Sequence, residues 1–201
     1  MDILNKSQFR HFSERLWPKN YSVDSGHNNG RLQIRNCSWR GEDESIQDGK
    51  IAVLPNFVSV MCPVQKEDGL YLICVLDWKH GMNRVFLNVP SGACEEGEMM
   101  DKSASREVEE ETGLKCVSIH PLNKNPIVLN GRYLNCKFVP FYAELKEAGS
   151  SKIENPDEFT KTVLIKWNDW MEFIQEGIVE ASSIITTYLF MESEFWKKYS
   201  S

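Results

Sequence analysis

Short apolar runs separated by turn-forming residues dominate the pattern of this chain. The segments 51–64, 70–76 and 85–89 are rich in Val, Ile, Leu and Phe, which is typical of buried β-strands. Glu67-Asp68-Gly69 separates the first two and suits a hairpin connection. We therefore expect a β-rich unit in the middle of the chain.

Helical spacing appears between and after these strands. We predict a helix over 101–112 that Gly113 terminates, a short helix over 169–176, and a closing helix over 183–198 with Ser183 as N-cap. Further strands are expected at 117–119, 127–129, 133–145 and 162–167. This order predicts an α+β fold in which helices cover the faces of a sheet.

The first 49 residues differ in character from the rest. They are polar and thinly apolar, and they predict a helix over 1–17 followed by short strands at 21–23 and 31–39. From Lys50 the apolar content rises. We therefore divide the chain into an N-terminal element of residues 1–49 and a main domain of residues 50–201.

Composition excludes several classes of protein. The 201 residues carry a net charge of −6 with a pI near 5.3, so a broad basic face for long nucleic acid is not expected. No apolar run is long enough to predict a membrane span or a signal peptide. The six cysteines are scattered without a CxxC pair, so we interpret them as reduced thiols of a cytosolic protein and predict no zinc site.

The predicted helix 101–112 crowds three carboxylates together. At about 100° per residue, Glu107 and Glu111 lie one turn apart and Glu110 falls within the same arc. Like charges at this spacing repel, and a solvated acidic helix face is the simplest alternative interpretation. A bound cation removes the repulsion, and carboxylate oxygens favour Mg²⁺ or Mn²⁺.

The loop before this helix adds two further features. Gly92 and Gly97 allow the loop to fold back, so that Glu98 approaches the helix. Arg106 is then placed to hold Glu98 by a charge-assisted pair. Ala104 and Val108 would anchor the opposite side of the helix to the core, so the segment alternates apolar anchoring with cation binding.

The whole segment resembles the Nudix box. All nine fixed positions match, a coincidence expected on the order of once in ten million such chains. These positions are Gly92, Glu98, Arg106, Glu107, Val108, Glu110, Glu111, Gly113 and Leu114. The resemblance implies a Nudix-type α/β/α sandwich with a mixed sheet. It also implies metal ligation by Glu107, Glu110, Glu111 and the Ser91 carbonyl, supported by Gly92, Glu98, Arg106 and Gly113.

Outside the box the chain is most similar to the ADP-ribose pyrophosphatase branch. The similar segments are 48–53, 89–92, 157–159 and 177–184. By this resemblance Glu158 lies in a mobile loop and positions or deprotonates the attacking water, with Glu154 as the alternative. The branch commonly forms homodimers through N-terminal strands, which implies a homodimer here.

The chain also departs from that branch. Asn88 stands where the branch has Glu, Ser91 where it has Ala, and Lys79 near its usual Arg. The candidate substrate-binding residues are Lys79, Arg106, Trp39 and Trp78. For either Trp, packing in the core or on the surface is the competing interpretation.

The expected activity is metal-dependent hydrolysis of ADP-ribose to AMP and ribose 5-phosphate, with Glu110, Glu111 and Glu158 as catalytic residues. A nucleotide sugar or a dinucleoside polyphosphate is the alternative substrate. A module that binds ADP-ribose without cleaving it is the alternative of another class. The expected partner is therefore a small nucleoside-diphosphate compound, and the expected cofactor is Mg²⁺ or Mn²⁺.

Overall fold

The computed structural model describes residues 2–5, 8–9, 32–40, 46–146, 154–155 and 160–200. Its strands are β1 Asp2–Leu4, β2 Gln33–Arg40, β3 Ile46–Val53, β4 Phe57–Met61, β5 Pro63–Lys66, β6 Gly69–Lys79, β7 Arg84–Asn88, β8 Ser91–Ala93, β9 Cys116–Pro121, β10 Ile127–Val128, β11 Leu134–Asn135, β12 Lys137–Leu145, β13 Glu154–Asn155 and β14 Thr160–Lys166. Its helices are α2 Met100–Thr112, α3 Trp167–Gln175, α4 Ala181–Glu192 and the 3-10 helix η1 Glu194–Lys198.

Two sheets form the body of the molecule. One runs in the order β1-β14-β6-β5, with β7 added to β6 and β13 to β14. The other runs β10-β12-β4-β8, with β9 added to β12. Both contain parallel and antiparallel pairs, since β1 is parallel to β14 and β4 is parallel to β12. The predicted α+β class with a mixed sheet is therefore confirmed.

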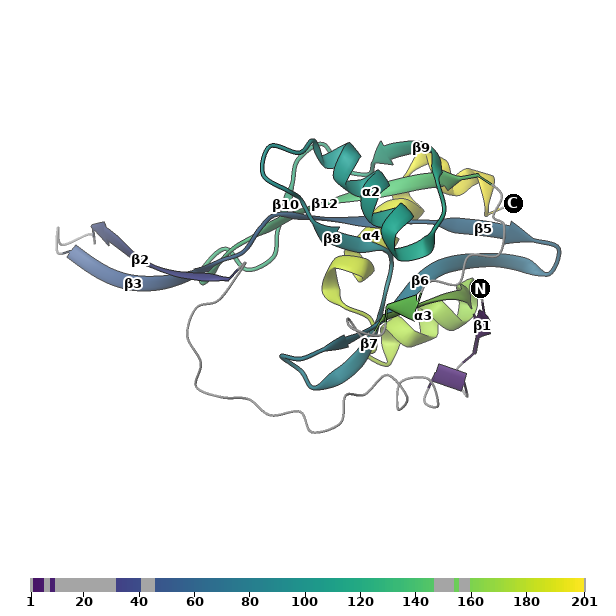
Figure 1. Cartoon of the computed structure of the whole chain (residues 1–201), viewed down its shortest axis with the longest axis horizontal. Coiled ribbons are helices and arrows are strands. Elements are labelled where there is room, and N and C mark those ends of the chain that lie inside the picture. The colour runs from purple at the N-terminus through teal and green to yellow at the C-terminus, as the bar shows by residue number, and fades with distance from the viewer. Residues whose placement is uncertain are drawn as a thin grey trace.

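The helices cover these sheets and create two hydrophobic cores (Figure 1). Helix α2 packs on β4, β8 and β9, whereas α4 packs on β4 and β12 and α3 on β6 and β14. The core beneath α2 includes Ala104 and Val108, both fully buried. The core beneath α3 and α4 includes Trp170 and Phe190, also fully buried. Strand β4 is sandwiched between α2 and α4, so both helices are positioned from one strand.

Helix α2 forms where the sequence predicts it. Asp101 lies in its first turn, where a negative charge is favourable. Gly113 ends it with a left-handed φ of 70°, and its N–H donates to the Glu109 carbonyl. Because a side chain at this φ is strained, a glycine is favoured here. The buried Ala104 and Val108 fix which face of the helix turns outward.

The N-terminal region departs from the expectation. Residues Asp2–Leu4 form a strand paired in parallel with Val163–Ile165, so the prediction of a helix from residue 1 is wrong there. Pairing with a ready-made sheet edge outweighs a weak helical pattern in so short a segment. The predicted strand at 21–23 lies outside the described residues. The predicted boundary at residues 49 and 50 falls inside β3.

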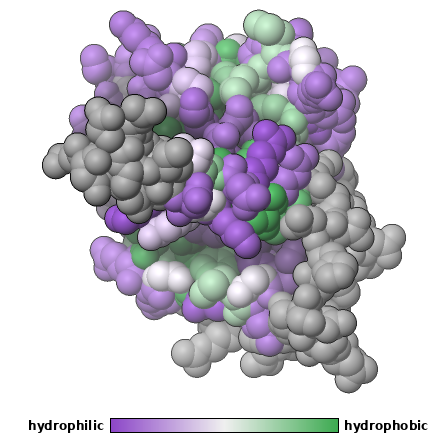
Figure 2. Space-filling view, turned by 90° about the vertical axis from the view of Figure 1, so that its left-hand side faces the viewer, coloured by the Kyte–Doolittle hydropathy of each residue, from purple (hydrophilic) through white to green (hydrophobic). Residues whose placement is uncertain are grey.

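A long hairpin of β2 and β3 extends away from the body (Figure 1). Its register pairs Gln33 with Val53 and Arg40 with Ile46. At its base, β11 adds to β3 in parallel, because Leu134 pairs with Ala52. Seen from the hairpin end, polar and apolar residues intermix on the molecular face (Figure 2). The described side chains of β2 are mostly exposed, since only Cys37 is half-buried among residues 33–38.

Three predicted elements are divided. The run 51–64 separates into parts of β3, β4 and β5, and the run 133–145 separates into β11 and β12. The closing helix ends at Glu192 and continues as η1 after Ser193. It also begins before the predicted Ser183, with Glu180 at the N-cap position, so the prediction of Ser183 as N-cap is wrong. The Ser183 hydroxyl accepts from the Val89 N–H instead.

Two further predictions concern bulk properties. All six cysteines are free thiols in this structure. Across the described parts of the chain, no helix is both long and apolar enough to cross a membrane.

Candidate active site

Strand β8 and helix α2 approach each other closely at Gly92. A Cβ built on Gly92 would overlap the carboxylate of Glu107. Gly92 lies in β8, where it pairs with Val58 of β4. The glycine therefore allows the Glu107 carboxylate to lie directly against the backbone of β8. Any larger residue at 92 would push that carboxylate or the strand away.

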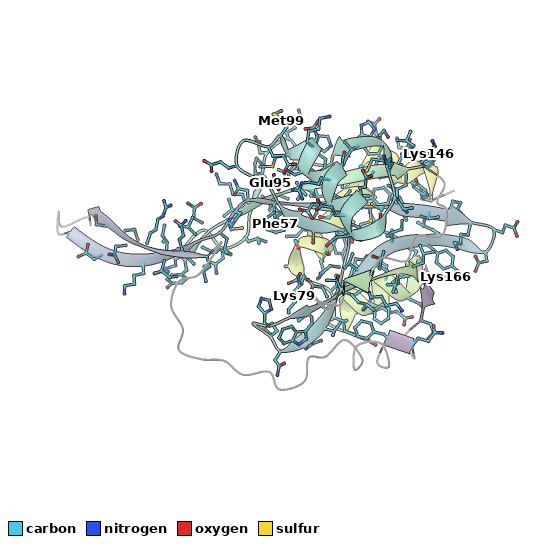
Figure 3. The ribbon with its side chains drawn as sticks, viewed as in Figure 1. Phe57, Lys79, Glu95, Met99, Lys146 and Lys166 are labelled. Atoms are coloured by element: carbon cyan, nitrogen blue, oxygen red, sulfur yellow. The ribbon has the colours of Figure 1, made fainter. Side chains whose placement is uncertain are left out.

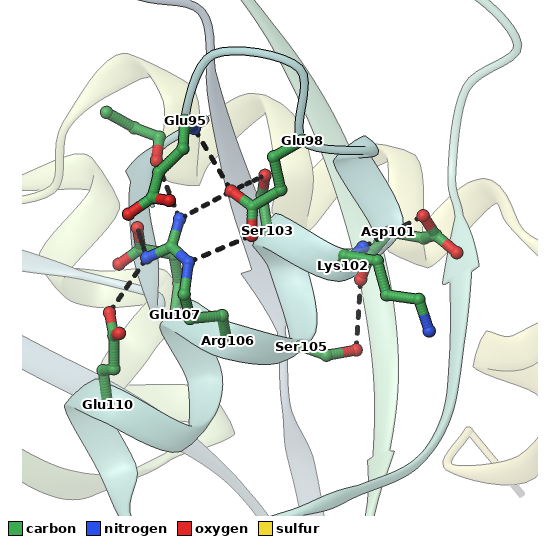
Figure 4. A network of polar contacts seen from close by, with 10 residues as sticks. Glu95, Glu98, Asp101, Lys102, Ser103, Ser105, Arg106, Glu107 and Glu110 are labelled. Atoms are coloured by element: carbon green, nitrogen blue, oxygen red, sulfur yellow. Dashed lines mark hydrogen bonds and ion pairs between the residues drawn. The ribbon is translucent and has the colours of Figure 1, made fainter.

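Arg106 is the centre of a dense polar network (Figure 4). Its Nε and Nη2 donate to the two oxygens of Glu98 at 3.1 and 2.9 Å, and Nη2 also donates to the Ala93 carbonyl at 3.0 Å. Its Nη1 donates to Glu107 at 2.7 Å and to Glu110 at 2.9 Å. A guanidinium has five N–H donors, and these contacts engage all of them.

Glu98 is held from several sides. Besides Arg106, the Ser103 hydroxyl donates to it at 2.6 Å and the Glu95 N–H at 3.1 Å. Bonds from Arg106, Ser103 and the Glu95 N–H lower the pKa of Glu98 to about 2. Glu98 therefore stays ionised at all ordinary pH values and ties the loop to α2.

Glu111 is hydrogen-bonded to strand β8, which precedes this loop. The Ser91 N–H donates to its Oε2 at 2.9 Å, and the Thr162 hydroxyl of β14 donates to its backbone carbonyl. Burial raises the pKa of Glu111 to about 8, against the Ser91 hydrogen bond and with a further contribution from the charge of Glu107. Glu111 is thus a carboxyl group whose ionisation is suppressed by its surroundings.

The donor set suits a hard divalent cation. Around Arg106 lie three carboxylates, those of Glu98, Glu107 and Glu110, so one positive charge is outnumbered. Among the residues that the structure describes, no three acidic, His or Cys side chains are already arranged as a metal-binding group. Arg106 Nη1 is bonded to both Glu107 and Glu110. A cation at these two carboxylates would therefore compete with Arg106 for their oxygens.

Lys79 lies on β6 near the turn into β7, apart from Glu95 of the loop before α2 (Figure 3). It forms ion pairs with Asp77 and, at 3.2 Å, with Glu180. Burial lowers the pKa of Lys79, but the charges of Glu180 and Asp77 outweigh this and raise it. The charge of Asp77 also raises the pKa of Glu111 and that of Lys79 lowers it, both less than burial does.

The two tryptophans have different outcomes. Trp78 is 8% exposed and belongs to the core beneath α3 and α4, which supports the packing interpretation. Trp39 pairs with Gln47 in the hairpin, but its side chain lies outside the described part. Glu158 also lies outside the described residues, and Glu154 is described only through its backbone pairing with Lys161.

Some residues near the site were not predicted from the sequence. Asp77 lies two positions before the predicted Lys79 on β6, so the two share one sheet face, a signal that the sequence does contain. Ser103, Thr162 and Glu180 reach the site from a helix, a distant strand and the start of α4. Ser103 belongs to the box helix itself, whereas only the tertiary arrangement brings Thr162 to Glu111 and Glu180 to Lys79.

The family follows from a comparison of the sequence with family models. The NUDIX domain model matches residues 55–186, well over half of the chain. The chain belongs to the Nudix family. It is therefore a Nudix diphosphatase, an enzyme class that hydrolyses nucleoside-diphosphate compounds and generally uses divalent metal ions.

Solved structures share the fold of this chain. One, described as "Crystal structure of ADP compounds hydrolase", has a TM-score of 0.65 at 18% identity and covers 88% of this chain and 92% of its own. In all, 297 chains of solved structures match significantly. A comparison with curated protein sequences gave no significant match. The structural likeness shows the fold, whereas the sequence match shows the family.

The raised pKa of Glu111 predicts how the metal-free protein responds to pH. Between its ordinary value of 4.5 and about 8, unfolded Glu111 loses its proton while folded Glu111 keeps it. Rising pH therefore destabilises the folded state over this window, and no further above it. We expect Glu111→Gln to raise stability at pH 8 by about 1 kcal/mol or more, with little effect at pH 4.5.

Thermal unfolding in EDTA at both pH values measures this effect. Glu109→Gln is the matched control, since Glu109 lies on the same helix with 54% of its side chain exposed and forms an ion pair with Lys115 at 3.5 Å. A Glu111→Gln protein that is less stable than wild type at pH 8 would contradict the prediction.

Proposed function

We propose that this Nudix diphosphatase hydrolyses ADP-ribose to AMP and ribose 5-phosphate and depends on Mg²⁺ or Mn²⁺. The observation that carries the metal dependence is the crowding of Glu98, Glu107 and Glu110 around Arg106, where negative charge exceeds positive. The ADP-ribose assignment is supported by the sequence resemblance in segments 89–92 and 177–184. A structure of similar fold also bears the description "ADP compounds hydrolase".

The proposed reaction breaks one P–O bond of the diphosphate by attack of water on phosphorus. Glu107, Glu110, Glu111 and the Ser91 carbonyl would hold the divalent ion, which neutralises charge on the diphosphate and lowers the pKa of the attacking water. Arg106 keeps Glu98 and the loop in place, so we assign it a positioning role in addition to the substrate contact expected from the sequence. Lys79 is the cation proposed to contact the diphosphate.

Contacts between β8 and α2 would hold two of the proposed metal ligands in place before the cation binds. The Ser91 N–H holds Glu111 and the Gly92 backbone admits Glu107, so two proposed ligands are fixed by one short strand. Such preorganisation limits the rearrangement needed when cation and substrate bind. Lys79 is already paired with Asp77 and Glu180, so a diphosphate would compete with these two carboxylates for its ammonium group.

The first prediction of this proposal concerns turnover. We expect purified protein with Mg²⁺ to convert ADP-ribose to AMP, and Glu111→Gln to lower kcat by about 100-fold or more. Glu109→Gln, on the outer face of α2, should retain near-wild-type turnover. Product chromatography with ADP-ribose, a nucleotide sugar and a dinucleoside polyphosphate identifies the preferred substrate.

The outcomes separate the alternatives. Faster turnover of a nucleotide sugar or a dinucleoside polyphosphate would replace ADP-ribose as substrate but keep the site. Binding of ADP-ribose without any product would favour a non-catalytic sensor. Full activity in Glu111→Gln, or in EDTA, would overturn the proposed metal site.

A second prediction concerns the general base. We propose Glu158 for this role from the resemblance, with Glu154 as the alternative. Glu158→Gln should lower kcat by about 100-fold with little change in Mn²⁺ affinity, because the residue acts on water and is not proposed as a ligand. Glu154→Gln serves as the matched variant. If Glu154→Gln instead causes the loss, the assignment passes to Glu154.

A third prediction concerns assembly. We propose that residues 1–49 contribute to a homodimer through the β2–β3 hairpin, which extends from the body and exposes Leu32 and Ile34 at 42% and 46%. Light scattering should give twice the chain mass of 23.2 kDa. Ile34→Glu should shift the protein toward monomer, whereas Val117→Glu, at a 66% exposed position on β9, should not. A monomeric wild type would refute the dimer.

A further inference from the structure

Three consecutive residues immediately before Gly92, the first residue of the box, are each held by a different element. The Val89 N–H donates to the Ser183 hydroxyl of α4 at 3.1 Å. The Pro90 carbonyl accepts from the Val60 N–H of β4 at 2.8 Å. The Ser91 N–H donates to Glu111 of α2 at 2.9 Å. The segment 89–91 is therefore the point where α4, β4 and α2 meet.

The contact from α4 is made by a wholly buried hydroxyl group. Ser183 is 0% exposed, and besides accepting from Val89 it donates to the Asn88 Oδ1 at 3.4 Å. The Nδ2 of the same Asn88 side chain is buried without a hydrogen-bond partner among the described residues. The Ser183 hydroxyl therefore faces Asn88 and Val89, which lead from the end of β7 toward the box. Its function lies outside its own helix.

A second hydroxyl of α4 secures the neighbouring strand. Thr186 donates to the hydroxyl of Ser59 at 3.0 Å, and both residues are fully buried. Ser59 is the register partner of Ser91 across β4 and β8. Helix α4 is thus attached on both sides of Ser91, through Val89 along the chain and through Ser59 across the sheet.

This arrangement transmits the position of α4 to the box. Buried hydrogen bonds are directional, and an unsatisfied Val89 N–H would have to move to find another acceptor. Pro90 separates Val89 from Ser91, and its fixed φ leaves the segment little freedom to absorb such a shift. Movement of Val89 would therefore displace the Ser91 carbonyl and the N–H that holds Glu111.

We propose that Ser183 is a positioning residue of the active site, which sets the Val89–Ser91 segment and thereby the geometry offered to the divalent cation by the Ser91 carbonyl and Glu111. This inference rests on the proposed metal-dependent function. Ser183 touches neither cation nor substrate in this role. Groups that orient metal ligands typically change metal affinity 10- to 100-fold when they are lost.

Thr187 offers a matched comparison within the same helix. It is also 0% exposed; its hydroxyl donates to the Ser183 backbone carbonyl at 2.8 Å within the helix and accepts from the Trp170 Nε1 at 3.0 Å. That contact lies in the core between α3 and α4 and does not involve the box strand. Ser183→Ala and Thr187→Val therefore each remove one buried hydroxyl of α4, but only the first removes it from the segment 89–91.

The test measures Mn²⁺ binding to the full-length protein without substrate, by the loss of the free-ion electron paramagnetic resonance signal. We expect Ser183→Ala to weaken Mn²⁺ binding by about tenfold or more, and Thr187→Val to leave it unchanged. In the metal-free proteins, we expect amide hydrogen exchange at Val89 and Ser91 to quicken in Ser183→Ala alone. Ser183→Cys, which keeps a weak acceptor and nearly the same volume, should give an intermediate affinity, and it replaces Ser183→Ala if that variant does not fold.

Each result decides between distinct conclusions. If wild type does not bind Mn²⁺, the proposed metal-dependent function fails. If wild type binds Mn²⁺ and the Ser183 variants bind it equally well, the positioning role is overturned while the function stands. If Thr187→Val weakens binding as much as Ser183→Ala, the effect belongs to general destabilisation of α4, and the proposal is also overturned.

Discussion

The pairing of Arg106 with the carboxylates of the box is the interaction on which the site depends. One guanidinium joins Glu98 of the loop to Glu107 and Glu110 of α2 and also fixes the Ala93 carbonyl. Without it, three carboxylates would repel one another and the loop would lose its main attachment to the helix. Because the planar guanidinium donates in several fixed directions, a lysine could not hold the same set of acceptors.

The rest of the fold holds this polar arrangement against the backbone of strand β8. The bare backbone at Gly92 admits Glu107, and Ser91 fixes Glu111, so strand β8 and helix α2 lie closer than side chains would usually allow. Strand β4 supports both α2 and α4. On the α4 side, a line of buried hydroxyls replaces purely apolar packing at the point nearest the box. Buried polar contacts specify position more narrowly than apolar ones because they are directional.

The electrostatics of the site leave it incomplete without a counter-charge. Glu98 is kept ionised by its partners, whereas burial and the charge of Glu107 suppress the ionisation of Glu111. Arg106 compensates only part of the negative charge. Lys79, on the neighbouring sheet, is already paired with Asp77 and Glu180. A divalent cation would neutralise the excess carboxylate charge around Arg106, and an anionic diphosphate would be attracted to Lys79. Both agree with the chemistry of the Nudix family.

The sequence by itself determined the local features of this protein. Helix α2 and its end at Gly113, the pairing of Glu98 with Arg106, and the family all follow from residues within one short segment, where helical periodicity and spacing fix the geometry. Tertiary structure alone decided what distant residues do. Asp2–Leu4 became a strand because a sheet edge was available, Trp78 entered the core, and Ser183 turned toward Val89 instead of capping its helix. Such contacts depend on how sheets and helices stack, and no spacing along the chain encodes them.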